Sequence, residues 1–256
     1  MIGLNGVQGV GKTTLVKALA EMLTKLGYST LVFSIDDLYL KHEDQVALAQ
    51  SHPDNFLVQQ RGEPGTHDMQ LARAFFDSIT GGSPPKCHHT TRQPFPAKET
   101  VSPRANGPSP GQPKVQVVIF EGWCVGFRAL PDPEVEAKWK GHSRTLQQHK
   151  LEHLLLVNER LKEYDTMTDL LDVFIHIDAE DTQYVYDWRL QQETALRQER
   201  GTGMTDEQVI KFVDGYYPAY ELFPDNVRRG VLPNRPGHQM RLVVGKDRRV
   251  KEHFIL

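Results

Sequence analysis

Short apolar runs alternate along the chain with longer segments in which apolar side chains recur at helical spacing. The apolar runs, each predicted to be a strand, are residues 2–5, 29–35, 115–123, 172–178 and 240–245. Leucines line one helical face in residues 14–23 and again in residues 145–164. Strands that alternate with helices predict one α/β domain over residues 1–256, with a parallel sheet and helices on both faces.

Residues that favour helix ends mark the boundaries of the predicted helices. Gly27 suits the end of the first helix, because glycine readily adopts the left-handed backbone found there. Asp68 or Thr66 can cap the helix that follows them, and Thr205 with Gln208 forms a capping box. Further helices are predicted over residues 42–60, 68–79, 180–199 and 205–220.

A glycine-rich loop joins the first strand to the first helix. Residues 6–13 fit the pattern G-x-x-x-x-G-K-[ST] without a mismatch, in the strand–loop–helix context that the pattern needs. Glycines let backbone N–H groups point at phosphate oxygens, and the helix N-terminus adds its positive dipole end. The predicted nucleotide-binding residues are Gly6, Val7, Gln8, Gly9, Val10, Gly11, Lys12, Thr13 and Thr14. Lys12 is expected to reach the β- and γ-phosphates, and the Thr13 hydroxyl is expected to bind Mg²⁺.

Acidic residues end two of the predicted strands. Asp36 and Asp37 follow residues 29–35, and Glu121 lies near the end of residues 115–123. The carboxyl ends of parallel strands are where such sheets bind ligands, so these acids are candidates for an active site. In a chain with a phosphate loop, Glu121 is expected to act on Mg²⁺ directly or through water. The alternative is that the acids only cap helices or turn the chain.

Composition and charge exclude several classes of function. The formal net charge of -3 argues against a general nucleic-acid binder. The two cysteines, Cys87 and Cys124, have neither disulfide nor metal-ligand spacing and favour a reducing compartment. No apolar stretch reaches the length of a membrane span and no targeting signal is visible, so we expect a cytoplasmic protein, with the nucleus as an alternative. The abrupt first strand indicates that residues are missing upstream of Met1, and the sequence is silent on oligomeric state.

A long charged segment over residues 180–199 ends at a Gly-Thr-Gly sequence. Arg189 and Arg197 lie on it. One interpretation is an ordinary solvated helix. The other is a mobile lid over residues 180–204 whose arginines close over a transferring phosphoryl group.

Five segments, in this order, resemble the D-glycerate 3-kinases and their fungal relatives, which are described as ATP-dependent kinases. They are residues 6–13, 34–39, 61–68 and 120–123, and residues 188–193 together with 203–205. The resemblance covers almost the whole chain and implies a P-loop kinase of the group that includes phosphoribulokinase, uridine kinase and pantothenate kinase. It also implies that the acid placed like Asp36 is the general base, and that residues 61–68 are similar to a substrate-side segment of pantothenate kinase.

The chain departs from the family in one place. The family carries a segment of the form Pro-x-Tyr-Asp-Lys-Ser-x-Phe-x-Gly-x-Gly-Asp-Arg, where this chain has the unrelated residues 87–101. Residues 81–114 as a whole are rich in Pro, Gly, Ser and Thr and predict a flexible or aberrant insert. Codons allowed for residues 88–101 can spell the family segment in a shifted frame. The hypothesis is that about residues 86–102 are a frameshifted or mis-spliced reading, which would weaken or abolish activity; the alternative is a natural divergent insert.

These patterns together predict an ATP-dependent kinase of a small hydroxy acid. The predicted catalytic residues are Asp36, Lys12, Arg189 and Arg197, and the predicted substrate residues are Asp37, Tyr39, Arg61, His67 and Asp68. D-glycerate as acceptor, with 3-phosphoglycerate as product, follows from the resemblance, and Arg61 is the expected partner of its carboxylate. The alternatives are a kinase of a nucleoside or pantothenate-like alcohol, and a non-catalytic nucleotide-binding protein with a damaged substrate segment. A GTPase is disfavoured because the chain has no Asn-Lys-x-Asp motif.

Overall fold

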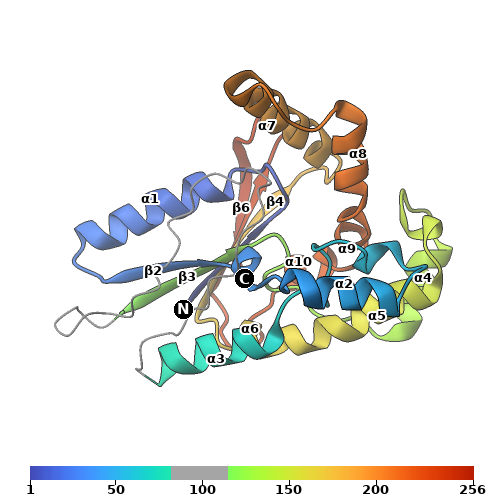
Figure 1. The fold of residues 1–256 in the computed structure, drawn as a ribbon. Coiled ribbons are helices and arrows are strands. Elements are labelled where there is room, and N and C mark those ends of the chain that lie inside the picture. Colours follow the sequence, from blue (N-terminus) through green and yellow to red (C-terminus); the bar gives the residue numbers. More distant parts are fainter. Residues whose placement is uncertain (82–114) are drawn as a thin grey trace.

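A six-stranded sheet forms the centre of the computed structural model, which describes residues 1–81 and 115–256 (Figure 1). The strands are β1 (Ile2–Gly6), β2 (Thr30–Ser34), β3 (Val117–Gly122), β4 (Val173–Ala179), β5 (Gln239–Val244) and β6 (Val250–Ile255). Their order across the sheet is β2-β3-β1-β4-β5-β6. The first five strands run parallel to one another. The strand that leads into the phosphate loop, β1, therefore lies inside the sheet, with a parallel neighbour on each side.

Helices cover both faces of this sheet, as the sequence predicted; α1 lies on one face and α3 on the other (Figure 1). The α-helices are α1 (Lys12–Lys25), α2 (His42–Ser51), α3 (Met69–Thr80), α4 (Asp132–Lys140), α5 (Leu151–Leu161), α6 (Asp165–Thr168), α7 (Tyr184–Arg200), α8 (Asp206–Asp214), α9 (Tyr217–Leu222) and α10 (Pro224–Arg229). Short 3₁₀ helices are η1 (Ile35–Leu38), η2 (Phe56–Val58), η3 (Leu146–Gln148) and η4 (Lys162–Tyr164). In the described part of the chain, none of the helices is both long and apolar enough to cross a membrane.

Two apolar cores, one on each face, explain the unbroken apolar runs. Successive strand side chains point to opposite faces, so Ile119 lies in one core and the next residue, Phe120, lies in the other. The first core packs the sheet against α1 and α7, and includes Leu4, Val16, Ile177 and Trp188. The second packs it against α3, α5 and α9, and includes Phe33, Phe76, Leu154, Phe174 and Leu222. A sheet buried on both faces needs apolar residues at every position rather than at alternate ones.

The strand at one edge of the sheet differs from the expected parallel arrangement. β6 pairs antiparallel with β5, and all six of its residues are exposed. Because no β6 side chain enters a core, the segment has no apolar pattern from which it could be predicted. The charged run of residues 246–251 forms the turn of this hairpin and the start of its second strand.

Several predicted helices are shorter than expected. The segment 42–60 contains α2 and then the separate η2, and the segment 205–220 is divided into α8 and α9 near Gly215. Only the middle of the segment 145–164 is α-helical, as α5. The predicted caps are confirmed: the Asp68 carboxylate accepts the Leu71 amide at 2.8 Å, and the Thr205 capping box is formed. The predicted insert over residues 81–114, including the frameshift hypothesis for residues 86–102, falls beyond Gly81 outside the described residues.

Candidate active site

The phosphate loop has the backbone shape that its glycines require. Gly9 and Gly11 have φ angles of 79° and 110°, in the left-handed region that favours glycine. A Cβ atom on Gly9 would also lie 2.7 Å from the Cβ of Trp188, so a larger residue does not fit there. α1 begins at Lys12, directly after the loop, and its first backbone N–H groups are available to an anion. Thr13 and Thr14 are exposed on this first turn.

Lys12, Asp36 and Glu121 are brought together at the carboxyl ends of β1, β2 and β3. Burial lowers the pKa of Lys12, while the nearby charges of Glu121 and Asp36 oppose that change. Burial raises the pKa of Glu121, with Lys12 acting in the opposite direction and Asp36 raising it further. The Lys12 ammonium group donates to the carbonyl oxygens of Gly6 at 2.7 Å and Val7 at 3.2 Å. The sequence could anticipate this grouping, because parallel strands place their carboxyl ends along one edge.

The two aspartates that follow β2 have different surroundings. Ser34 caps η1, and its backbone N–H donates to the Asp37 carboxylate at 3.2 Å, which completes a capping box. Asp37 therefore serves the local turn. Asp36 is exposed beside Lys12, and its charge also acts on Tyr39 and Tyr216.

The loop of residues 61–68 packs against the segment that follows η1. His67 is buried; its ring stacks on Tyr39 with centroids 4.4 Å apart, and its Nδ1 lies 2.5 Å from the Tyr164 hydroxyl. Arg61 is exposed, with its guanidinium 5.5 Å from the centroid of the Tyr39 ring. Asp68 is the N-cap of α3, which was one of the two roles considered for it. The structure thus places Tyr39, Arg61 and His67 together and gives Asp68 a structural role.

The two candidate arginines of the lid are engaged by other side chains on α7 and α8. Arg189 donates to Glu193 at 3.1 Å, and its guanidinium lies 4.7 Å from the centroid of the Phe212 ring. Arg197 donates to Asp206 at 2.7 Å. Among the described residues, neither arginine hydrogen-bonds to the phosphate loop. Contact with a phosphate would require both to exchange their present partners.

Known proteins are similar to this chain in sequence and in structure. An uncharacterized kinase of Schizosaccharomyces pombe, mug58, is 35% identical over 255 residues, which cover 97% of this chain and 88% of that protein. The solved structure of D-glycerate 3-kinase from Cryptococcus neoformans superposes with a TM-score of 0.80 at 33% identity, covering 100% of this chain and 89% of that one. The chain belongs to the D-glycerate 3-kinase family. It is therefore a kinase, a phosphotransferase built on the P-loop fold.

The chloroplastic D-glycerate 3-kinase of Arabidopsis thaliana is a longer relative. It is 32% identical over 254 residues, and the match covers 97% of this chain but 53% of the plant protein, so this chain spans about half its length. No known sequence-family profile matches the chain.

An arginine that the sequence did not single out reaches the phosphate loop of this kinase. Arg248, in the turn between β5 and β6, donates from Nε to the carbonyl oxygen of Gly9 at 2.7 Å. Its guanidinium also lies 5.3 Å from the centroid of the ring of Trp188, a residue of α7 that itself packs closely on Gly9. The loop is thus held between α7 and the β5–β6 hairpin. The run of charges in residues 246–251 gave no sign of which member would turn inward.

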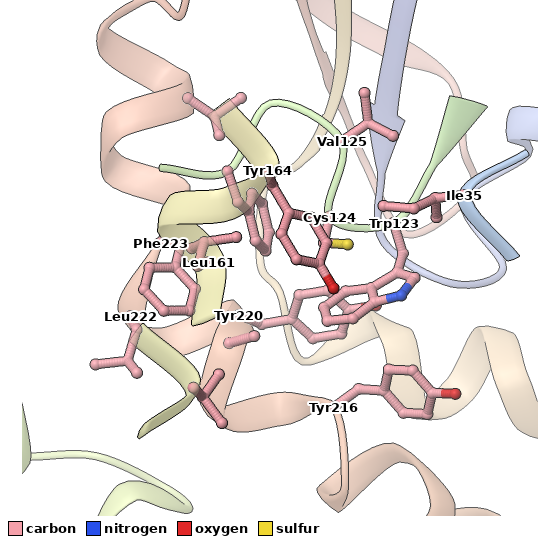
Figure 2. Packing of buried hydrophobic residues seen from close by; sticks show 14 of the residues in the cluster. Ile35, Trp123, Cys124, Val125, Leu161, Tyr164, Tyr216, Tyr220, Leu222 and Phe223 are labelled. Carbon is pink, nitrogen blue, oxygen red and sulfur yellow. The ribbon is translucent and has the colours of Figure 1, made fainter. Parts of the chain in front are cut away.

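An aromatic cluster that sequence reasoning also missed lies beside the kinase site. Trp123, next but one after Glu121, packs edge-on against Tyr216 and Tyr220, at centroid distances of 5.1 Å and 5.5 Å (Figure 2). The Tyr220 hydroxyl accepts the backbone N–H of Gln8 in the phosphate loop at 3.3 Å. Trp123 and its neighbours therefore connect the phosphate loop with the loop of residues 61–68.

Proposed function

We propose that this chain transfers the γ-phosphoryl group of ATP to a hydroxyl of D-glycerate, which gives 3-phosphoglycerate and ADP. The observation that carries the proposal is the grouping of Lys12, Asp36 and Glu121 beside the phosphate loop. The acceptor is supported by the two relatives that bear the name D-glycerate 3-kinase.

The residues divide the work of an in-line phosphoryl transfer. The loop of residues 6–14 holds the phosphates of ATP through backbone N–H groups, and Lys12 stabilises the negative charge of the transferring group. Asp36 accepts the proton of the substrate hydroxyl as its oxygen bonds to the γ-phosphorus. The bond between that phosphorus and the bridging oxygen breaks, and ADP leaves with the electron pair. Asp36 suits this role because it is exposed and its charge acts on Lys12.

Thr13 and Glu121 fit a magnesium site. Both offer oxygen atoms, which hard divalent cations prefer. The charge of Asp36 adds to the rise in the pKa of Glu121, and a bound cation would offset that repulsion. Mg²⁺ bound there would neutralise part of the phosphate charge.

The lid assignment for residues 180–204 belongs to the same proposal. Arg189 and Arg197 would leave Glu193 and Asp206 when phosphates are present. The Arg197–Asp206 pair is partly solvated, with 35% and 63% of the two side chains exposed, and such pairs contribute about 0–1 kcal/mol. Exchange of that pair for a phosphate contact therefore costs little.

ATP consumption by the purified chain tests the proposal, with D-glycerate, uridine, pantothenate, ribulose 5-phosphate or no acceptor. We expect turnover with D-glycerate that Asp36→Asn abolishes and that Asp77→Asn, an exposed carboxylate on α3, leaves unchanged. Turnover with another alcohol would overturn the assigned acceptor. ATP binding without turnover on any acceptor would overturn the catalytic assignment.

A further inference from the structure

Two N–H donors are buried near the site without an acceptor. The indole Nε1 of Trp123 and the Nε2 of His67 have no hydrogen-bond partner among the described residues. The other two tryptophans differ in this respect: Trp139 donates to the His149 carbonyl at 2.9 Å, and Trp188 donates to the Lys246 carbonyl at 2.8 Å. Buried donors that lack partners are rare in folded proteins, because water no longer compensates them. The Trp123 N–H is therefore available to donate to a ligand.

The hydrogen bonds around His67 indicate which of its nitrogens carries the proton. The backbone N–H of Gly65 donates to the Tyr164 hydroxyl oxygen at 3.1 Å, and His67 Nδ1 lies 2.5 Å from the same oxygen, so we infer that the hydroxyl donates its own proton to Nδ1. Burial also lowers the pKa of His67 to about 3, which keeps the ring neutral. A neutral ring that accepts at Nδ1 carries its proton on Nε2. Nε2 is thus a donor.

Both donors belong to one continuous group of rings beside Asp36. His67 stacks on Tyr39, and the Tyr39 hydroxyl is hydrogen-bonded to Tyr216. Tyr216 in turn packs against Trp123, and Figure 2 shows the indole nitrogen at the end of the ring that is turned away from Tyr220. The charge of Asp36 reaches both Tyr39 and Tyr216.

We propose that Trp123 Nε1–H and His67 Nε2–H hold the carboxylate of the acceptor while Asp36 takes the proton of its hydroxyl. The inference rests on the proposed function, because it concerns the same acceptor. A pair of groups that can only donate matches a carboxylate, which can only accept and has two oxygens. Arg61, the partner expected from the sequence, is exposed, with its guanidinium 5.5 Å from the centroid of the Tyr39 ring.

A buried acid nearby does not oppose this assignment. Glu63 lies close to Tyr216 and Tyr220 and would repel a carboxylate if it were ionised. Burial raises the pKa of Glu63 well above its usual range, with only a smaller opposing effect from the Ala219 amide. Burial therefore favours the neutral form of Glu63.

The test is Trp123→Phe, which keeps an aromatic ring and removes the N–H, with Trp139→Phe as the matched control. We expect the KM for D-glycerate to rise about 10- to 100-fold in Trp123→Phe, the value of one hydrogen bond to a charged group. The KM for ATP should change less than about twofold in the same variant, which also reports that it is folded. Glycerol has a hydroxymethyl group in place of the carboxylate, so the preference for D-glycerate over glycerol should fall by the same factor as the KM rises. Trp139→Phe should change none of these values.

Each outcome separates the inference from the proposed function. D-glycerate turnover that is unaffected by Trp123→Phe, or an equal loss with glycerol, overturns the carboxylate assignment and leaves the proposed function standing. Binding of D-glycerate, glycolate or lactate that depends on Trp123, without turnover, overturns the proposed function and supports the carboxylate site. Neither binding nor turnover in the wild-type chain overturns both. If Trp123→Phe does not fold, His67→Asn replaces it, because asparagine still accepts from Tyr164 and places no donor where Nε2 stood.

Discussion

The neutral state of His67 makes a quantitative prediction about acid stability. The ring is buried between Tyr39 and Tyr164, and burial alone lowers its pKa from 6.5 to about 3. The unfolded chain carries an ordinary histidine, which binds a proton below pH 6.5. Between these two pH values the unfolded state therefore holds one more proton than the folded state, and acid favours unfolding. His67→Asn removes the group that binds this proton in the unfolded chain and keeps an acceptor for the Tyr164 hydroxyl.

The size of this loss of stability in acid follows from the shift in the pKa of His67. One extra proton in the unfolded state lowers the free energy of unfolding by about 1.4 kcal/mol for each pH unit below 6.5. At pH 5 the folded ring is still neutral, so His67 costs the wild-type chain about 2 kcal/mol relative to pH 7.5. His176, whose pKa burial lowers to about 4, adds a similar loss, but it is present in both proteins and cancels. Between pH 7.5 and pH 5, the free energy of unfolding of His67→Asn should thus fall by about 2 kcal/mol less than that of the wild type.

Urea denaturation at pH 5 and pH 7.5, followed by tryptophan fluorescence, measures the difference. His67→Asn also leaves a smaller side chain in the site, but that cost is the same at both pH values and drops out of the comparison. Equal loss of stability between the two pH values in both proteins would refute the reasoning. It would also overturn the assignment of Nδ1 as an acceptor, because a ring that is protonated in the folded protein donates from both nitrogens.

Three further substitutions test other parts of the structure. Lys12→Met should lower kcat about 10²- to 10³-fold in a steady-state assay, because it removes a cation directed at the transferring phosphate; a loss below tenfold would contradict that role. Gly126→Ala should lower the free energy of unfolding by about 2–4 kcal/mol, measured by denaturation. Gly126 has a φ of 82°, and an added Cβ would lie 2.5 Å from Phe174 Cζ. The KM for ATP should not change in this variant. Asn158→Ala should cost about 2–4 kcal/mol, because the Leu130 N–H and C=O both bond to its buried amide at 2.8 Å, and an unchanged midpoint would count against that account.

The residues grouped at the carboxyl ends of the parallel strands could be predicted because each belongs to a short continuous stretch of sequence. The phosphate loop, the aspartates after β2 and Glu121 in β3 are each marked by their own neighbours in sequence. That Lys12, Asp36 and Glu121 meet follows from one general property of parallel sheets, the alignment of carboxyl ends. Asp68 shows the limit of such local reasoning: cap and substrate contact were equally consistent with the sequence, and only the 2.8 Å bond to Leu71 identifies the cap.

Features made by distant segments could not be predicted. Trp123, Tyr39 and Tyr216 come from three parts of the chain, and nothing local to any of them indicates that their rings adjoin. β6 was missed for another reason: its exposed side chains follow no apolar pattern, and its place in the sheet comes from backbone pairing with β5. Arg248 was hidden for the same reason, since its neighbours in the charged run remain exposed.

The hydrogen bond between Arg248 and Gly9 can form only late in the synthesis of the chain. The two residues are separated by 239 positions, so a ribosome releases the phosphate loop long before the side chain that bonds to it. At about 5–20 residues per second, the interval is roughly 10–50 s. During that time β1 can pair with β3 and later with β4, but the loop lacks its contact with the hairpin. A nucleotide that prefers the completed loop would therefore stabilise finished chains and give little help to nascent ones.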